Sequence, residues 1–322
     1  MLISVIITNY NYGQFLGAAI DSVLSQTHGD VECIVVDDGS TDNSRAVIEQ
    51  RPSAKAVFKA NGGQASAFRA GVDQARGQVI IGLDSDDYLF SHACARIAAA
   101  WSPGLSCLNY RLRVTGQSFE SWPVEAFLDS GHAEFFDAHG YFPSAPMSGN
   151  AFDANYVRTL LARAEHLDGD GVDAYLLYSS PFFGRIGHID DTLGFYRTHG
   201  GNVSMTSGRK TVKNLGDHAY YQFWGQQNAQ RLAGERGYAV RRRGHLVGAY
   251  PNLWLLVAKD GGYDRRRLPD QSRLRTTAAA LRAFARQPGI SALSRLKNIC
   301  LLLTLSVLPL RLRQRIESWA IL

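Results

Sequence analysis

The chain has 322 residues, and 45% of them are hydrophobic, which is enough to bury one large core or two smaller ones and excludes general disorder. Its four cysteines form no C-x-x-C pair, so neither a zinc site nor a disulfide framework is indicated, and a reducing cytoplasm is the simplest setting (Cys33, Cys94, Cys107, Cys300). The net charge of +5 conceals two halves of opposite sign, because residues 1–208 carry 13 basic and 23 acidic side chains whereas residues 209–322 carry 21 and 6.

The first 90 residues alternate short apolar runs with helical patterns. The N-terminal run lacks a basic segment and a cleavage site, so we interpret it as a strand and not as a signal peptide. Strands are predicted at residues 2–8, 31–36, 55–59 and 78–83, and helices at 13–26, 42–50 and 63–75. This alternation indicates βαβ units and a parallel sheet that is covered on both faces.

Beyond residue 87 the alternation weakens. We expect a helix at 92–100, a strand at 105–114, irregular substrate-facing structure at 115–150, helices at 153–163 and 172–183, and short strands at 185–189 and 193–196. From Arg209 onward the pattern is mostly helical, with breaks near Gly234, Gly244, Gly261 and Pro288. The sequence therefore predicts two domains, at residues 1–208 and 209–322.

A polar cluster follows each of the first four predicted strands. The clusters are Thr8 to Asn11, Asp37 to Ser40, Asn61 to Gly63, and Asp84 to Asp87. Ligands of open α/β sheets bind beyond the carboxyl ends of the strands, so one crevice could collect all four clusters.

The fourth cluster places three carboxylates within four residues at a strand end. Carboxylate oxygens suit Mg²⁺ and Mn²⁺, and such sites use one or two carboxylates together with phosphate oxygens of the substrate. An isolated D-x-D is more often a polar turn. The three clusters before it favour a metal site and a diphosphate-bearing substrate.

These motifs resemble the N-terminal half of family 2 glycosyltransferases, inverting enzymes of the GT-A fold that use nucleotide-diphosphate sugars. The matching segments are Ser4 to Asn11, Val35 to Asp42, Asn61 to Ser66, and Leu83 to Asp87. The resemblance implies an α/β fold with a GT-A type, Rossmann-like and mostly parallel sheet flanked by helices. A mainly helical, basic C-terminal region would follow it.

The resemblance also implies a nucleotide site. Asp38 would bond the base, Thr8 and Tyr10 would line its pocket, Asp37 would support the turn or the ribose, and Gly39 would allow a close turn. The implied nucleotide-binding residues are Thr8, Asn9, Tyr10, Asp37, Asp38, Gly39, Asn61, Gly63 and Asp84. For Tyr10 core packing stays open as an alternative, and Asp42 is either part of the motif or an acid in the first turn of a helix.

The resemblance places Mn²⁺ or Mg²⁺ on Asp86, with Asp84 near the ribose or bound to the ion through water. A second segment, Leu193 to His199, resembles the Y-R-x-H sequence that closes many such domains. It implies that His199 completes the metal shell or contacts the diphosphate, and that Arg197 pairs with the diphosphate. A structural role for His199 stays open.

Inversion by direct displacement also needs a general base, which in this family is usually the Asp of a Glu-Asp pair opening a helix. The corresponding segment, Gly169 to Leu176, lacks that pair. Asp173 is the first candidate and Asp170 the second; the alternative is an acid that only charges a helix start. A further departure is Arg69, where many relatives carry Asn.

The basic tail, Arg295 to Arg315, encloses an apolar stretch of about 12 residues, whereas a spanning helix needs roughly 20. It could dock on an anionic membrane surface, or it could pack on the catalytic domain or on a second subunit, so an oligomer stays open. Nucleic acid fits the charge, but no nucleic-acid-binding motif is present and none is expected as a partner.

The sequence thus predicts an inverting, metal-dependent transferase. It would move a sugar from a nucleotide-diphosphate donor, with UDP implied by family habit, to a glycan or lipid-linked acceptor in surface-polysaccharide assembly. The expected location is the cytoplasm, with peripheral contact at the inner face of the membrane. Two alternatives are a catalytically idle homologue docking at anionic membranes and a sugar-phosphate nucleotidyltransferase, although the Gly-rich basic loop of the latter is missing after the first strand.

Overall fold

The computed structural model of the chain describes residues 1–114, 120–123, 125–164, 171–199, 212–240, 272–286 and 292–307. It divides into two compact units, Met1–His132 with Pro143–Thr198, and Ala133–Phe142 with His199–Leu322. The predicted domain boundary at residues 208 and 209 lies outside the described residues and stays a prediction.

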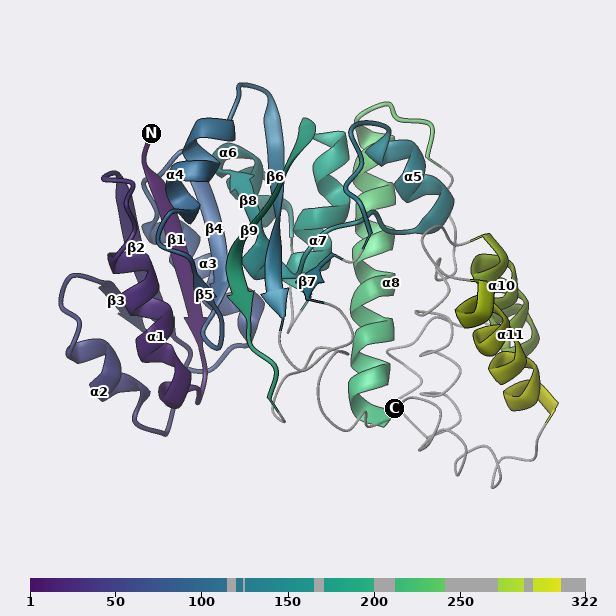
Figure 1. Ribbon diagram of the computed structural model, residues 1–322, viewed down its shortest axis with the longest axis horizontal. Coiled ribbons are helices and arrows are strands. Elements are labelled where there is room, and N and C mark those ends of the chain that lie inside the picture. Colours follow the sequence, from purple (N-terminus) through teal and green to yellow (C-terminus); the bar gives the residue numbers. More distant parts are fainter. Residues whose placement is uncertain are drawn as a thin grey trace. The chain divides into compact units, whose positions relative to one another are not determined.

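The first unit opens with four parallel strands in the order β3-β2-β1-β4, with β1 flanked by β2 and β4 (Figure 1). The elements are β1 (Ile3–Asn9), α1 (Gly13–Leu24), β2 (Val31–Asp37), α2 (Ser44–Glu49), β3 (Lys55–Phe58), α3 (Gln64–Gln74) and β4 (Val79–Asp84). Each predicted element is confirmed to within two residues at either end, because the β-branched strands and the glycine and polar turns between them give strong local signals.

The second half of this unit extends the sheet with strands of mixed direction. The elements are β5 (Tyr88–Leu89), α4 (Ala93–Ala100), β6 (Leu105–Val114), β7 (Ser121–Trp122), β8 (Asn150–Asp153), α6 (Ala154–Arg163), α7 (Val172–Ser179) and β9 (Arg185–Tyr196), with 3-10 turns at Met147–Gly149 and Ser180–Phe182. Strand β8 runs antiparallel to β4 and β6, whereas β6 and β9 are parallel. Within the described residues this gives one nine-stranded sheet, confirming an α/β fold.

Two expectations for this half need correction. Strand β8 was not predicted, because four residues are too few to show a period; only its first residue, Asn150, lies in the stretch expected to be irregular. The two short strands predicted at 185–189 and 193–196 are one strand, β9. The register of β9 against β6 shifts at this point, so that Ile189 pairs with Tyr110 and Thr192 with Arg111, and the polar Asp190–Asp191 pair left between them hid the continuity.

The second unit is helical where it is described. It contains α5 (His132–His139), α8 (Val212–Glu235), α10 (Arg273–Arg286) and α11 (Ala292–Val307). The Gln226 side chain of α8 is buried and donates from Nε2 to the carbonyl oxygen of Gly140 at 3.0 Å, which ties the α5 segment to this unit. Helix α5 corrects the expectation of irregular structure throughout residues 115–150.

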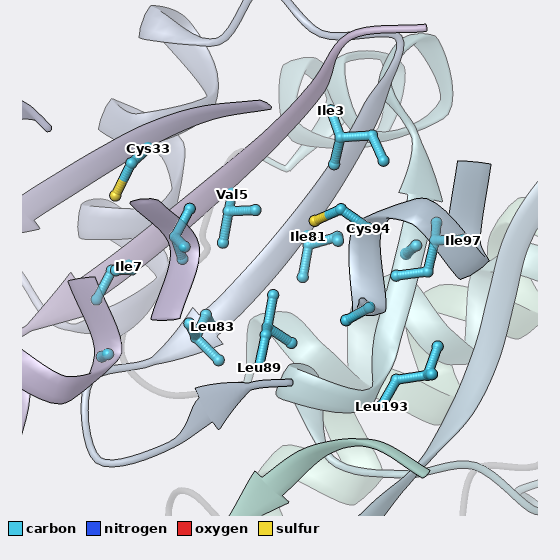
Figure 2. Packing of buried hydrophobic residues seen from close by; sticks show 14 of the residues in the cluster. Ile3, Val5, Ile7, Cys33, Ile81, Leu83, Leu89, Cys94, Ile97 and Leu193 are labelled. Carbon is cyan, nitrogen blue, oxygen red and sulfur yellow. The ribbon is translucent and has the colours of Figure 1, made fainter. Parts of the chain in front are cut away.

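The core of the first unit covers both faces of the sheet. Figure 2 shows Ile3, Val5 and Ile7 of β1 packing with Ile81 and Leu83 of β4 and with Ile97 of α4. Helix α3 covers the opposite face so closely that a Cβ at Gly71 would lie 2.3 Å from Cγ2 of Ile6. Burying each such side chain contributes about 1.5–3 kcal/mol, so these contacts fix the strands that carry the polar loops.

Near the amino ends of the parallel strands, the Glu32 carboxylate of β2 joins three segments. Its Oε1 accepts hydrogen bonds from Ser4 Oγ at 2.6 Å, from the Arg76 N–H at 2.6 Å and from the Gly77 N–H at 3.1 Å. Burial by itself would raise the pKa of Glu32, but the hydrogen bonds from Ser4 and Arg76 prevail and lower it. A carboxyl whose pKa is lowered by folding stabilises the folded state above its unfolded pKa, about 4.3 for Glu.

We expect Glu32→Gln to lower the free energy of unfolding at neutral pH by about 1–3 kcal/mol, the usual contribution of hydrogen bonds to a charged group. The difference from the wild type should shrink as the pH falls below about 4.3 and the native carboxylate takes up its proton. Urea unfolding between acid and neutral pH measures it. The control is Glu49→Gln, because Glu49 forms an exposed pair with Arg45 and should contribute less than about 1 kcal/mol. Equal destabilisation by Glu32→Gln at every pH would contradict the electrostatic account.

Candidate active site

The register of three strands brings the polar loops together. Along the sheet, Asn9 at the end of β1 pairs with Asp37 of β2, while Thr8 pairs with Asp84 of β4. The carboxyl ends of these parallel strands therefore lie side by side, as expected for a ligand-binding edge.

Asn9 and Asp37 form a buried hydrogen-bonded support for the first two loops. The Nδ2 of Asn9 donates to Asp37 Oδ1 at 3.0 Å and to Ser40 Oγ at 3.1 Å, and Ser40 Oγ also donates to Asp37 Oδ1. Asn11 adopts a positive φ of 58°, which Asn tolerates better than most residues, and its Oδ1 accepts from the Thr41 N–H at 2.8 Å. Both loops are thereby held in one conformation.

Tyr10 is 47% exposed, so core packing does not account for it, whereas Thr8 is half-buried. Asp42 has a structural function. Its carboxylate accepts from the N–H groups of Gly13 and Ser44, both at 2.9 Å, at the starts of α1 and α2. Burial works against ionisation, but the bonds from Ser44 and Gly13 lower the pKa of Asp42 overall.

Asp38 organises the third loop. Its buried carboxylate accepts from Lys59 Nζ at 2.5 Å, from the Gly62 N–H at 3.0 Å and from the Gly63 N–H at 2.7 Å. Gly39 adopts a φ of +79°, and a Cβ there would lie 2.8 Å from the backbone nitrogen of Asn61, so this approach requires glycine. Lys59 could not be predicted from the sequence, because its partner Asp38 lies 21 residues away, just after the neighbouring strand.

The fourth loop concentrates negative charge. Asp84 Oδ1 accepts from Gln64 Nε2 at 3.0 Å, and both Asp84 and Asp86 are partly exposed. Asp87 is buried, and this burial, followed by the charges of Asp86 and Asp84, raises its pKa well above the usual range. Burial raises the pKa of Tyr12, and the charges of Asp86 and Asp84 raise it further. Tyr12 directly follows the first motif, but its place near these acids was not predicted from the sequence.

The end of β9 braces this acidic loop. The Arg197 N–H donates to Asp87 Oδ1 at 3.0 Å, and Arg197 Nε donates to the carbonyl oxygen of Asp86 at 2.9 Å. The guanidinium carbon lies 4.8 Å from the ring centroid of Phe15, a cation–π contact. The diphosphate role implied for Arg197 stays a prediction, as does the role of His199, which belongs to the second unit.

The acidic loop fits a divalent ion that the substrate helps to hold. Among the described residues no three His, Cys, Asp or Glu side chains are grouped to ligate one ion. Asp84 and Asp86 nevertheless act on the same two neighbours, Asp87 and Tyr12, so their negative charges converge. One or two carboxylates completed by phosphate oxygens is the usual donor set for Mg²⁺ and suits Mn²⁺.

Asp173 lies in the first turn of α7 and is partly exposed, whereas the other residues of that helix are buried. Its Oδ1 accepts from the Ala174 N–H at 2.7 Å. Asp170 lies outside the described residues. In the second unit, none of the described helices combines the length and apolar content that crossing a bilayer requires.

The chain is similar to known proteins of one family. The family model described as glycosyl transferase family 2 matches residues 4–144. An uncharacterized glycosyltransferase of Nostoc sp. (strain PCC 7120) is 36% identical over 234 residues, which are 66% of this chain and 69% of the relative. The chondroitin synthase of Pasteurella multocida is 44% identical over 92 residues, 27% of this chain but only 10% of that protein.

Among solved structures, S. aureus TarS residues 1–349 in complex with UDP-GlcNAc superposes with a TM-score of 0.54 at 15% identity, covering 99% of this chain and 90% of that one. At this identity the likeness concerns the fold. Together with the family model and the Nostoc relative, it establishes that the chain belongs to glycosyltransferase family 2 and has the GT-A fold.

Proposed function

We propose that this glycosyltransferase is inverting and metal-dependent, and that it moves a sugar from a UDP-sugar to a glycan or lipid-linked acceptor in surface-polysaccharide assembly. One observation carries the proposal: the loop with Asp84 and Asp86 lies beside the loops that follow β1 and β2, which are proposed to bind the nucleotide. TarS, which shares the fold, has been crystallised with UDP, and the Pasteurella relatives are a chondroitin synthase and a hyaluronan synthase.

On the donor side, each loop has a proposed task. Asp38 bonds the base and Tyr10 stacks on it, with Thr8, Asn9, Asp37, Gly39, Asn61 and Gly63 shaping the pocket. Asp86, with Asp84 directly or through water, would hold Mn²⁺ or Mg²⁺ together with phosphate oxygens of the donor. When bound, the ion offsets negative charge on the departing nucleotide as a Lewis acid.

On the acceptor side, Asp173 takes the proton of the attacking hydroxyl. The acceptor oxygen forms a bond to the anomeric carbon while the bond from that carbon to the diphosphate oxygen breaks, and the nucleoside diphosphate leaves with the electron pair. Because attack and departure occur on opposite faces, the configuration inverts. Proton transfer by a positioned carboxylate contributes typically about 10²–10⁴-fold to such a rate.

We expect Asp86→Asn to lower turnover at least about 100-fold, because losing a few kcal/mol of charge stabilisation corresponds to that factor. The fold should persist and even gain stability, since the substitution removes a charge that raises the pKa of buried Asp87. Release of UDP from a panel of UDP-sugars with Mn²⁺, combined with thermal melting, measures both effects.

The control for Asp86 is Asp191→Asn, an acid of β9 that pairs with Arg96 at 2.6 Å and should leave turnover unchanged. Undiminished turnover of the Asp86 variant would sink the metal assignment. A wild-type protein that releases no UDP from any donor, yet binds anionic vesicles, would favour the idle homologue.

For the base, we expect Asp173→Asn to lower kcat by about 10²–10⁴-fold while the Kd for UDP changes less than about twofold, because the base acts only on the acceptor. Initial rates and calorimetric titration with UDP and Mn²⁺ separate the two quantities. Asp73→Asn, at an exposed acid of α3, is the control. If Asp170→Asn abolishes turnover and Asp173→Asn does not, the base is Asp170.

The proposed membrane contact rests on the exposed face of α11. Leu293, Leu296 and Leu303 are 78%, 60% and 50% exposed, and their spacing of three and seven places them on one side of the helix. Residues 272–316 contain nine Lys and Arg and no Asp or Glu. A second copy would bring like charges together, whereas anionic headgroups complement them. Of the predicted segment Arg295–Arg315, the part after Val307 lies outside the described residues.

We expect the triple variant Leu293→Asn, Leu296→Asn, Leu303→Asn to lose most co-sedimentation with phosphatidylglycerol-containing vesicles, because each buried leucine contributes about 1.5–3 kcal/mol. Raising the ionic strength from about 0.1 M to about 1 M should weaken vesicle binding of the wild type, because the Debye length shortens from about 10 to about 3 Å. The control is Leu24→Asn, at an exposed leucine of α1. Unchanged binding of the triple variant, or its conversion from dimer to monomer, would instead favour a protein contact for this face.

A further inference from the structure

Arg69, the residue that departs from the family pattern, holds the end of a helix distant in sequence. From the middle of α3 its Nη1 donates to the Leu161 carbonyl oxygen at 2.7 Å, and its Nη2 donates to the Ala164 carbonyl oxygen at 3.1 Å. These carbonyls belong to the C-terminal end of α6, where the last carbonyls of a helix lack partners within it. A cation there also complements the helix dipole.

Arg158 forms the reciprocal contact. It lies in α6, and its Nη2 donates to the carbonyl oxygen of Ala75 at 2.9 Å, the residue that ends α3. Two arginines therefore tie two antiparallel helices, one at each end of the pair. Each caps the C-terminus of the helix opposite to its own.

The two ends differ in their distance from the active-site edge. Helix α3 begins beside the acidic loop, where Gln64 Nε2 donates to Asp84 Oδ1 at 3.0 Å. It ends at the opposite edge of the sheet. Helix α6 begins at that opposite edge, where the Ala154 N–H donates to the Gln78 carbonyl oxygen at 3.0 Å, and runs back. Arg69 thus holds α6 at its site-facing end, and Arg158 acts at the distal end.

Helix α6 in turn holds α7. The Tyr156 hydroxyl of α6 donates to the carbonyl oxygen of Leu176, and the Tyr175 hydroxyl of α7 donates to that of Leu160 at 3.3 Å. Both tyrosines are buried, so these bonds lie in a low-dielectric interior. Asp173 occupies the first turn of this fastened helix.

We propose that Arg69 is a positioning residue for sugar transfer. By fixing the site-facing end of α6 to α3, it sets Asp173 at a defined position relative to the loops that follow β3 and β4, which are proposed to bind the sugar nucleotide. The inference rests on the proposed role of Asp173 as the base. Because a misplacement of about 1 Å can cost about 10²-fold in rate, a contact remote from the reacting atoms can control turnover.

The test compares Arg69→Met with Arg158→Met, since methionine keeps an apolar stem and removes the guanidinium in both variants. Both should lower the melting temperature. Arg69→Met should also lower kcat by about 10–100-fold with the UDP affinity unchanged, whereas Arg158→Met should keep kcat within about twofold. Arg69→Lys, which can bond one carbonyl, should restore part of the rate and serves if Arg69→Met does not fold. Equal kcat for the Arg69 and Arg158 variants would overturn the proposal.

A double-mutant cycle separates positioning from general destabilisation. In the Asp173→Asn background, Arg69→Met should cause no further loss of kcat, because the group it positions has already been removed. Losses that multiply would overturn the positioning role. If Asp173→Asn alone retains full turnover, the base assignment has failed, and a separate loss in Arg69→Met would then concern another group.

Discussion

The pairing of β1 with β2 on one side and β4 on the other fixes where the functional groups of the first unit lie. Because all three strands are parallel and in register, Asn9 meets Asp37 and Thr8 meets Asp84 without any contribution from the loops. The loops that follow these strands then form contacts with one another. Asn9 and Ser40 bond Asp37, Asn11 receives the Thr41 N–H, and the turn around Gly39 approaches Asn61. A strand shifted by one residue would reverse every side chain and dismantle the edge.

The crowding of carboxylates after β4 opposes stability, and surrounding contacts compensate for it. Burial, followed by the charges of Asp86 and Asp84, raises the pKa of Asp87, and its Oδ1 accepts from the Arg197 N–H. The Arg197 side chain reaches back to the Asp86 carbonyl and lies over Phe15, so the end of β9 and the start of α1 close around the loop. The divalent cation of the proposed function would relieve this repulsion.

The sequence predicted the first half of the fold and the four strand-end motifs because both depend on local signals: β-branched runs, glycines and polar turns. It did not predict contacts that join distant segments. Lys59 pairs with Asp38 at the ends of the neighbouring strands β3 and β2, and folding brings Tyr12 near the charges of Asp84 and Asp86. Strand β8 was hidden by its length, and β9 was divided by the polar residues Asp190 and Asp191 at its register shift. The residues predicted for the nucleotide, and Asp84 and Asp86 predicted for the metal, lie at or just after the ends of strands β1 to β4, whereas their individual roles stay predictions.

Two departures from the family pattern belong to the same part of the structure. The segment around Asp173 lacks the usual Glu-Asp pair, and Arg69 stands where many relatives carry Asn. Arg69 bonds the C-terminal end of α6. The hydroxyls of Tyr156 and Tyr175 join α6 to α7, and Asp173 lies in the first turn of α7. The proposed base, without its usual acidic neighbour, would need its position set by other means, and capping the adjoining helix α6 with a guanidinium restricts that helix. The two departures are therefore connected through α6, because Arg69 bonds the C-terminal end of α6 and two tyrosine hydroxyls join α6 to α7, whose first turn carries Asp173.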